Sequence, residues 1–121
     1  MNTRNPTKLL IIGTQHLDVA WLWNRVPQGE DLQRMVFELA LDLSEKHPDA
    51  GFVMSRSTAW GYDCVEKKHP ELFDRVRKAV IDGRIELCGG QWVEPDNLIP
   101  SGESLVRQGL YGQTYFRTRF G

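Results

Sequence analysis

The sequence has no apolar run long enough to cross a lipid bilayer. Its longest aliphatic run, Leu9–Ile12, is far shorter than the roughly 20 residues that a membrane-spanning helix needs. The first residues, Met1–Pro6, also lack the apolar core of a signal peptide. We therefore expect a cytoplasmic protein that makes no membrane contact.

The chain also lacks an excess of charge of either sign. Its 15 Lys and Arg residues and 16 Asp and Glu residues are interspersed, and the formal net charge is −1. Proteins that bind nucleic acids or anionic membranes usually carry a basic patch. The balance here argues against both partners and favours a neutral substrate such as a sugar.

Cysteine is scarce as well. Cys64 and Cys88 form no C-x-x-C pair, and two residues cannot build a framework of disulfides. We expect free thiols, as is usual in the cytosol. Because both lie in apolar sequence, they are interpreted as small buried side chains.

The composition is that of an ordinary globular protein, with 40% hydrophobic and 26% charged residues. At 121 residues, the chain fits one domain or part of a larger one. Apolar runs and helical periodicities alternate along it as three strand-then-helix units. The predicted strands cover residues 8–13, 51–55 and 85–89, and the predicted helices cover about 30–47, 58–68, 70–82 and 101–116.

Local signals mark several helix boundaries and faces. Pro70 suits the first residue of a helix, Gly83 suits a C-terminal cap, and Ser101 suits an N-terminal cap. His47 and His69 precede prolines at helix boundaries and are expected to be surface or capping residues. The first helix has an apolar stripe that is expected to face the core, formed by Leu32, Met35, Val36, Leu39 and Leu43.

Strands that alternate with helices predict an α/β fold with a parallel sheet and right-handed crossovers. Three βα units do not close a barrel, so residues 1–121 are expected to be the incomplete, amino-terminal part of a parallel β/α barrel domain. In such folds functional residues gather at the carboxyl ends of the strands. Three unusual loops are predicted there, over residues 16–23, 56–62 and 91–96.

The first of these loops contains an H-x-D pair, His16 and Asp18. In an extended segment, residues two apart point to the same side with Cα atoms about 6.6 Å apart, so both side chains could bind one cation at about 2.0–2.2 Å. The alternative is a histidine that simply hydrogen-bonds to a nearby aspartate. A zinc site would need a third ligand, for which Glu94 and Asp96 are the candidates in this chain.

The other polar and aromatic residues of these loops also allow two interpretations. Glu94 and Asp96 could act as an acid and a base, although we favour an Asp96 that binds backbone amides of its own turn. Trp60 and Tyr62 could stack on a ligand or pack over the sheet. The basic residues Lys67 and Arg75 are more simply part of a solvated helix face.

Two long segments resemble a known family. The segment His16–Trp23 is similar to the opening motif of glycoside hydrolase family 38, the retaining α-mannosidases. The segments Gly89–Asp96 and Pro100–Gln108 are similar to a second stretch of that family. Pro70–Phe73 and Gly83–Glu86 match the intervening pattern, so the resemblance covers nearly the whole chain.

The resemblance implies a seven-stranded β/α barrel with one Zn²⁺ ion and a mannose-containing glycan as substrate. It implies that His16 and Asp18 supply half of the zinc ligands and that Trp21 lies under the sugar. A retaining glycosidase needs two carboxyl groups about 5–5.5 Å apart. Because the family's nucleophile and acid/base have no matching positions in this chain, no catalytic residue is assigned, and the isolated chain is expected to be inactive.

Two alternatives remain at this point. The chain could belong to another metal-dependent β/α-barrel hydrolase that activates water, or to a non-catalytic module for sugar binding or assembly. Because three strands leave an open parallel edge, we also expect self-association through that edge.

Overall fold

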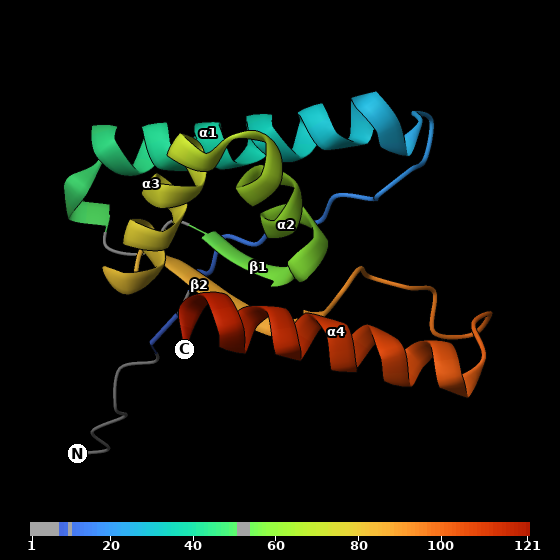
Figure 1. Ribbon diagram of the computed structural model, residues 1–121. Helices are drawn as coiled ribbons and strands as arrows, with labels where there is room; N and C mark the ends of the chain where they lie inside the picture. The colour runs from blue at the N-terminus through green and yellow to red at the C-terminus, as the bar shows by residue number, and fades with distance from the viewer. Residues whose placement is uncertain (1–7, 10, 51–53) are drawn as a thin grey trace, which may run out of the picture.

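The computed structural model describes residues 8–9, 11–50 and 54–121, which form a mixed α/β domain (Figure 1). Two parallel strands, β1 (Met54–Thr58) and β2 (Ile85–Gln91), form the sheet. The helices of the described part are α1 (Glu30–Lys46), α2 (Ala59–Lys68), α3 (Pro70–Ile81) and α4 (Gly102–Phe120). Two short turns, η1 (Arg25–Gly29) and η2 (Pro48–Ala50), flank α1.

The sheet has fewer strands than the sequence predicts. β1 and β2 pair in parallel, with Met54 opposite Ile85 and Arg56 opposite Leu87. The segment predicted as the first strand runs parallel to β1, but it contributes only an isolated bridge between Thr14 and Ser55. The prediction of a strand is therefore wrong for residues 8–9 and 11–13. Of the predicted strand 51–55, residues 51–53 lie outside the described residues.

The first segment is also far more exposed than expected. The backbone N–H of Ser55 donates to the carbonyl of Gly13 at 2.9 Å, which keeps the segment beside β1. Leu9, Ile11 and Ile12 nevertheless point into solvent, because the described part of the chain places no layer over them. The exposed fractions are 82% for Leu9, 87% for Ile11 and 59% for Ile12. The expectation of a strand buried on both faces is thus wrong.

The helices cover one face of the two strands. Met54 and Ile85 are buried in the core together with Phe37, Val76 and Tyr115 from the helices. Ser55 and Cys88 alternate with them along the strands and meet each other across the strands, with Oγ and Sγ 2.9 Å apart. Since neighbouring residues of a strand point to opposite faces, this pair marks the face that the core does not use.

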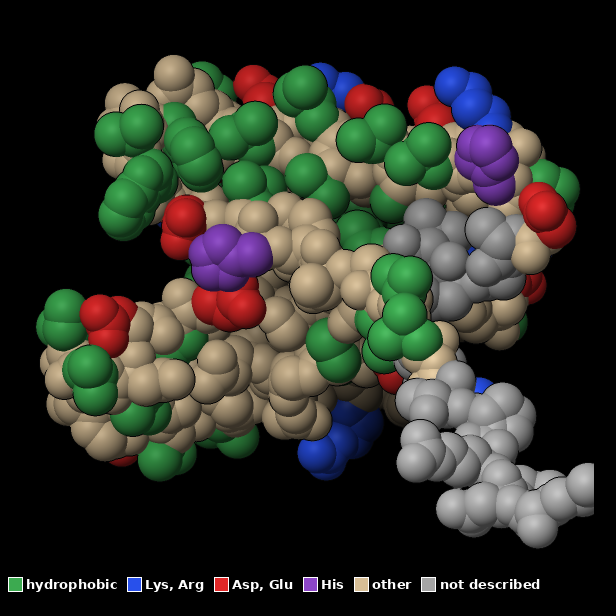
Figure 2. Space-filling model, turned by 180° about the vertical axis from the view of Figure 1, so that it is seen from behind, with side chains coloured by type: hydrophobic (Ala, Val, Ile, Leu, Met, Phe, Trp, Pro, Cys, Tyr) green, Lys and Arg blue, Asp and Glu red, His purple; other side chains and the backbone are tan. Residues whose placement is uncertain are grey.

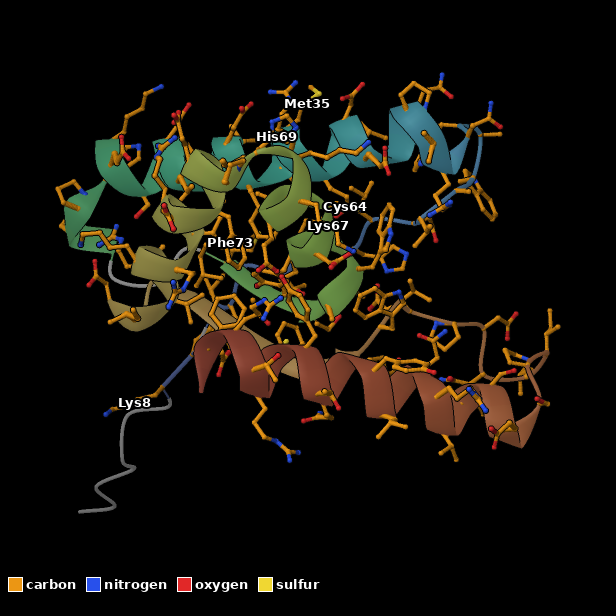
Figure 3. All side chains as sticks on the ribbon, viewed as in Figure 1. Lys8, Met35, Cys64, Lys67, His69 and Phe73 are labelled. Atoms are coloured by element: carbon orange, nitrogen blue, oxygen red, sulfur yellow. The ribbon has the colours of Figure 1, made fainter. Side chains whose placement is uncertain are left out.

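The apolar stripe predicted for α1 is not its buried face. The helix buries the side of Gln33, Phe37 and Leu41, while Met35 and Leu39 are 53% and 61% exposed. Hydrophobic side chains accordingly gather along α1 in the view from behind (Figure 2). Met35 points away from the sheet (Figure 3).

The helix has two apolar sides, and most of the predicted stripe belongs to the one that faces away from the core. Val36, Leu39 and Leu43 line an open groove of about 280 Å³ together with residues 13–15. The groove lies where the first segment approaches α1. Periodicity correctly identified a helix with apolar faces, but it did not show which face the core would use.

Most helix boundaries follow the local chemistry. Pro70 begins α3, and Gly83 follows that helix with a φ of +71°, which glycine adopts without strain. Ser101 caps α4, because its Oγ accepts from the backbone N–H of Ser104 at 3.2 Å. His47 and His69 are the C-terminal caps of α1 and α2, as predicted.

An arginine closes the C-terminal end of α1. The guanidinium of Arg84 donates to the carbonyl oxygens of Ser44 at 2.8 Å and of His47 at 3.1 Å. The last carbonyls of a helix have no partner within it, and Arg84 satisfies them from the turn that leads into β2. This contact ties the start of β2 to α1.

None of the helices that the structure describes is both long and apolar enough to cross a membrane.

Candidate functional site

Three segments that are distant in sequence meet around His16. The Nε2 atom of His16 lies 3.4 Å from Oδ1 of Asp18, and its Nδ1 atom lies 2.6 Å from Oε2 of Glu94. Ser57, near the end of β1, donates from Oγ to Oε1 of Glu94 at 3.3 Å. Acidic side chains flank a histidine on the face seen from behind (Figure 2). The cluster is open to solvent, since the His16 side chain is 65% exposed.

The spacing of His16 and Asp18 suits two ligands of one ion. Two tetrahedral ligands with bonds of about 2.0–2.1 Å are separated by roughly 3.3 Å. The observed 3.4 Å between Nε2 and Oδ1 is close to that value and is long for a hydrogen bond. The H-x-D spacing thus brings an imidazole nitrogen and a carboxylate oxygen within 3.4 Å of each other.

A third ligand does not complete this pair. Within residues 8–9, 11–50 and 54–121, no group of three or more His, Cys, Asp and Glu side chains lies close enough to hold a metal ion. Glu94 reaches His16, but at the nitrogen that faces away from Asp18. Asp96 instead accepts the backbone N–H of Leu98 at 2.9 Å, which confirms the interpretation that it stabilises its own turn.

Helix α4 holds the loop that carries Glu94. Within α4, the backbone carbonyl of Gln108 accepts from the N–H of Trp92 at 2.9 Å. Its side-chain Oε1 accepts from the N–H of Val93 at 2.8 Å. From the other side, the N–H of Trp60 donates to the carbonyl of Trp92 at 2.9 Å. The loop is therefore anchored immediately before Glu94.

The loop that carries His16 packs against the start of α1. A Cβ atom on Gly29 would lie 2.5 Å from the carbonyl oxygen of Val19, so only glycine permits this approach. Trp23 is half-buried, whereas Trp21 is 73% exposed. The indole of Trp21, predicted to lie under the sugar, is therefore available to a ligand.

The second predicted loop, over residues 56–62, is not a loop. These residues form the end of β1 and the start of α2. Trp60 and Tyr62 are 6% and 0% exposed, which confirms the packing interpretation over ligand stacking. The helix predicted over residues 58–68 is thus confirmed by α2, whereas the loop predicted over residues 56–62 is wrong.

Arg56 is a buried polar residue that the sequence reasoning missed. It is 1% exposed. Its guanidinium donates to Oε1 of Gln33 and lies 5.0 Å from the centre of the Phe37 ring. Burial lowers its pKa to about 10, so the group stays charged at neutral pH. The signal was available, because Arg56 shares the core-facing side of β1 with Met54.

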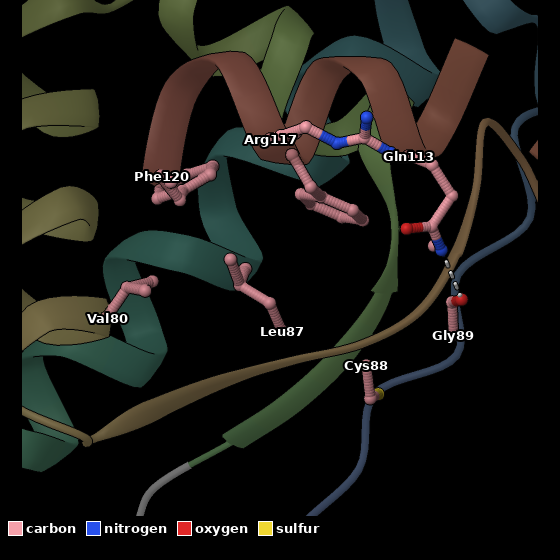
Figure 4. A pocket seen from close by; sticks show the side chains of 10 residues that line it. Val80, Leu87, Cys88, Gly89, Gln113, Arg117 and Phe120 are labelled. Atoms are coloured by element: carbon pink, nitrogen blue, oxygen red, sulfur yellow. Dashed lines mark hydrogen bonds between the residues drawn. The ribbon is translucent and has the colours of Figure 1, made fainter. Parts of the chain in front are cut away.

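The two cysteines are free, as predicted. Cys64 is buried, and burial raises the pKa of its thiol to about 11. Cys88 is half-buried and lines a cavity of about 370 Å³ between β2 and α4 (Figure 4). In the same cavity, Nε2 of Gln113 donates to the carbonyl of Gly89 at 3.2 Å. The exposed Lys67 and Arg75 lie on helix surfaces, as expected.

Residues 6–121 match the family described as the N-terminal domain of glycosyl hydrolases family 38. The chain is 35% identical to alpha-mannosidase G of Dictyostelium discoideum over 99% of its own length and 11% of that protein. It is 37% identical to alpha-mannosidase 2C1 of Homo sapiens, over 90% of this chain and 10% of that protein.

A yeast protein gives a similar result. The chain is 37% identical to an alpha-mannosidase of Saccharomyces cerevisiae, over 95% of this chain and 10% of that protein. The chain thus spans about a tenth of the length of these relatives.

Proposed function

Because the chain belongs to the N-terminal domain of the glycosyl hydrolases of family 38, we propose that the intact protein containing it is a retaining, zinc-dependent α-mannosidase. It hydrolyses α-mannosidic bonds of mannose-containing glycans or oligosaccharides. The observation that carries the zinc site is the convergence of His16 and Asp18, 3.4 Å apart at an exposed surface. The near-neutral net charge of −1 suits an uncharged sugar.

Three residues of this chain take part in the proposed site. His16 and Asp18 supply two of the zinc ligands, and the remaining ligands come from outside residues 1–121. A zinc ion held by His16 and Asp18 would supply Lewis-acid binding of neighbouring sugar hydroxyls and would support distortion of the sugar ring. The exposed Trp21 offers an aromatic ring on which the sugar can lie. The cytoplasmic location is part of the same proposal.

The proposed architecture is the first three βα units of a parallel β/α barrel. Its support is the arrangement of the segment 11–15, β1 and β2, which lie side by side in chain order and in parallel. The helices on one face of the strands agree with the outer layer of a barrel. The nucleophile and the acid/base required for retention lie outside this chain, so the isolated residues 1–121 are inactive.

The test uses the intact protein that contains residues 1–121. The unmodified protein should hold one zinc ion per chain and hydrolyse an aryl α-mannoside. His16→Ala and Asp18→Ala should each lose the stoichiometric zinc and reduce hydrolysis to background. His47→Ala is the matched control, because this exposed histidine caps α1 and should leave both measurements unchanged.

Other outcomes would replace this proposal. Hydrolysis of an aryl phosphate or an amide, without hydrolysis of the mannoside, would indicate another metal-dependent hydrolase. Sugar binding without zinc and without hydrolysis would indicate a binding module.

A further inference from the structure

Glu94 contacts His16 on the side of the ring that faces away from Asp18. We infer that Glu94 is a positioning residue: its carboxylate holds the imidazole through Nδ1 and thereby directs Nε2 to the point shared with Asp18. The inference rests on the zinc site proposed above. It assigns Glu94 neither as a zinc ligand nor as an acid or base.

The two distances around the imidazole distinguish its two nitrogens. Nδ1 lies 2.6 Å from Oε2 of Glu94, whereas Nε2 lies 3.4 Å from Oδ1 of Asp18. A neutral imidazole carries one proton, and a carboxylate can only accept. A ring that binds a metal ion through Nε2 keeps its proton on Nδ1, which here lies 2.6 Å from Oε2 of Glu94, and uses the lone pair on Nε2. Histidine ligands of metals are commonly held in this way by a carboxylate on the second nitrogen.

The same distances exclude Glu94 as a ligand of an ion shared by His16 and Asp18. One ion cannot bind both nitrogens of a single ring, because their lone pairs point in different directions. Asp18 lies at Nε2 and Glu94 at Nδ1, so the two carboxylates do not share a point. This agrees with the finding that no third ligand joins His16 and Asp18 among the residues that the structure describes.

Glu94 is itself held in place from two sides. Oγ of Ser57 donates to Oε1 of Glu94 at 3.3 Å, which leaves Oε2 for His16. Gln108 accepts the N–H of Val93, immediately before Glu94. Close packing keeps Ser57 near β2, because a Cβ on Gly89 would lie 2.8 Å from the Cβ of Ser57. A carboxylate anchored at both its side chain and its backbone can fix the angle of the imidazole.

Zinc affinity in the intact protein provides the first test. Glu94→Ala should weaken zinc binding by about 10–100-fold in competition with a chelator, the usual effect of losing such a partner. Glu94→Gln should recover most of the affinity, because its amide oxygen still accepts from Nδ1. Asp96→Asn is the matched control: it removes the same charge from the same loop, keeps its own turn, and should change the affinity less than about threefold.

The tautomer of His16 in the metal-free protein provides a second readout. A nitrogen-detected correlation spectrum of the imidazole should show the proton on Nδ1 in the unmodified protein and in Glu94→Gln. In Glu94→Ala this preference should be lost. This measurement does not depend on zinc, on activity or on the remaining ligands.

The outcomes separate this inference from the proposed function. If zinc binding depends on His16 but is unchanged in Glu94→Ala, the positioning role is wrong and the zinc site stands. If Glu94→Ala and Glu94→Gln both lose zinc as completely as His16→Ala, Glu94 is a ligand instead. If the unmodified protein holds no zinc, the proposed function fails and the inference fails with it.

Discussion

Arg56 and Gln33 form a buried pair in which the charge of Arg56 depends on the amide oxygen of Gln33. Arg56 is 1% exposed and Gln33 is 0% exposed. The amide oxygen of Gln33 accepts from the guanidinium, and the Phe37 ring lies against the cation. A buried charge that loses its acceptor is strongly destabilising, whereas removal of the whole polar pair is often tolerated. The pair therefore predicts a non-additive response.

Gln33→Leu should lower the free energy of unfolding by about 2–3 kcal/mol, because it removes a hydrogen bond to a charged group and leaves the guanidinium without its acceptor. The double variant Gln33→Leu/Arg56→Met should recover most of this loss, since no charge remains buried. Urea unfolding followed by tryptophan fluorescence measures both values. Equal destabilisation of the single and double variants would contradict this account.

The sequence predicted some side-chain contacts and missed others. The proximity of His16 and Asp18 follows from their spacing, since only one residue separates them. The contact of Glu94 with His16 depends on three separate segments. The sequence offered Glu94 as one of two candidates for a third ligand and as an acid or base, but not as a partner of His16. The alternation along β1 indicates that Arg56 faces the core, but its acceptor, Gln33, lies on another element and could not be predicted from local sequence.

At the scale of elements, two glycines in the interior of α4, Gly109 and Gly112, have opposite roles. Gly112 packs against β2, where an added Cβ would lie 2.5 Å from the carbonyl carbon of Gln91 and 2.8 Å from its oxygen. An added Cβ on Gly109 would meet nothing within 4 Å. Both lie inside the helix, where alanine is intrinsically favoured over glycine by up to about 1 kcal/mol. Contact with the strand should therefore decide the sign of each substitution.

Gly109→Ala should raise the free energy of unfolding by about 0.5–1 kcal/mol. Gly112→Ala should lower it by about 1–3 kcal/mol, because the new methyl group pushes α4 away from β2. Thermal or urea unfolding of the two variants, measured side by side, gives the comparison. A stabilising effect of Gly112→Ala would show that α4 does not pack this closely.

The predicted elements were most accurate where local chemistry sets them. The starts of α3 and α4 follow from Pro70 and from the hydroxyl of Ser101, both of which act within one turn. The buried face of α1 was predicted wrongly, because Phe37 and Leu41 form a second apolar side next to Met35 and Leu39. Only contact with α2 and α3 selected between these sides.

At the scale of the whole molecule, an apolar cavity and a strand edge remain uncovered. Ile11 and Ile12 line an open cavity of about 590 Å³ together with Val80, Ile85 and Leu87. In the described part of the chain, β2 pairs only with β1, so its other edge is unpaired. Uncovered strand edges and apolar patches favour association with another chain.

The isolated residues 1–121 should therefore self-associate, as sedimentation velocity can measure. Ile12→Lys should reduce the association, because it places a charge in the apolar cavity. Leu98→Lys is the matched control: Leu98 is 95% exposed on the loop before α4, so a lysine there should change little. A monomer at all accessible concentrations would contradict the prediction.

Sequence patterns were enough to predict the α/β class, most helix boundaries, the family, and the nearness of His16 to Asp18. All of these depend on residues a few positions apart or on motifs read along the chain. The tertiary structure alone decided which face of α1 is buried, that the first segment pairs with β1 through one bridge, and that Glu94 reaches Nδ1 of His16. These outcomes depend on contacts between distant segments, whose geometry is set by how the helices and strands pack together.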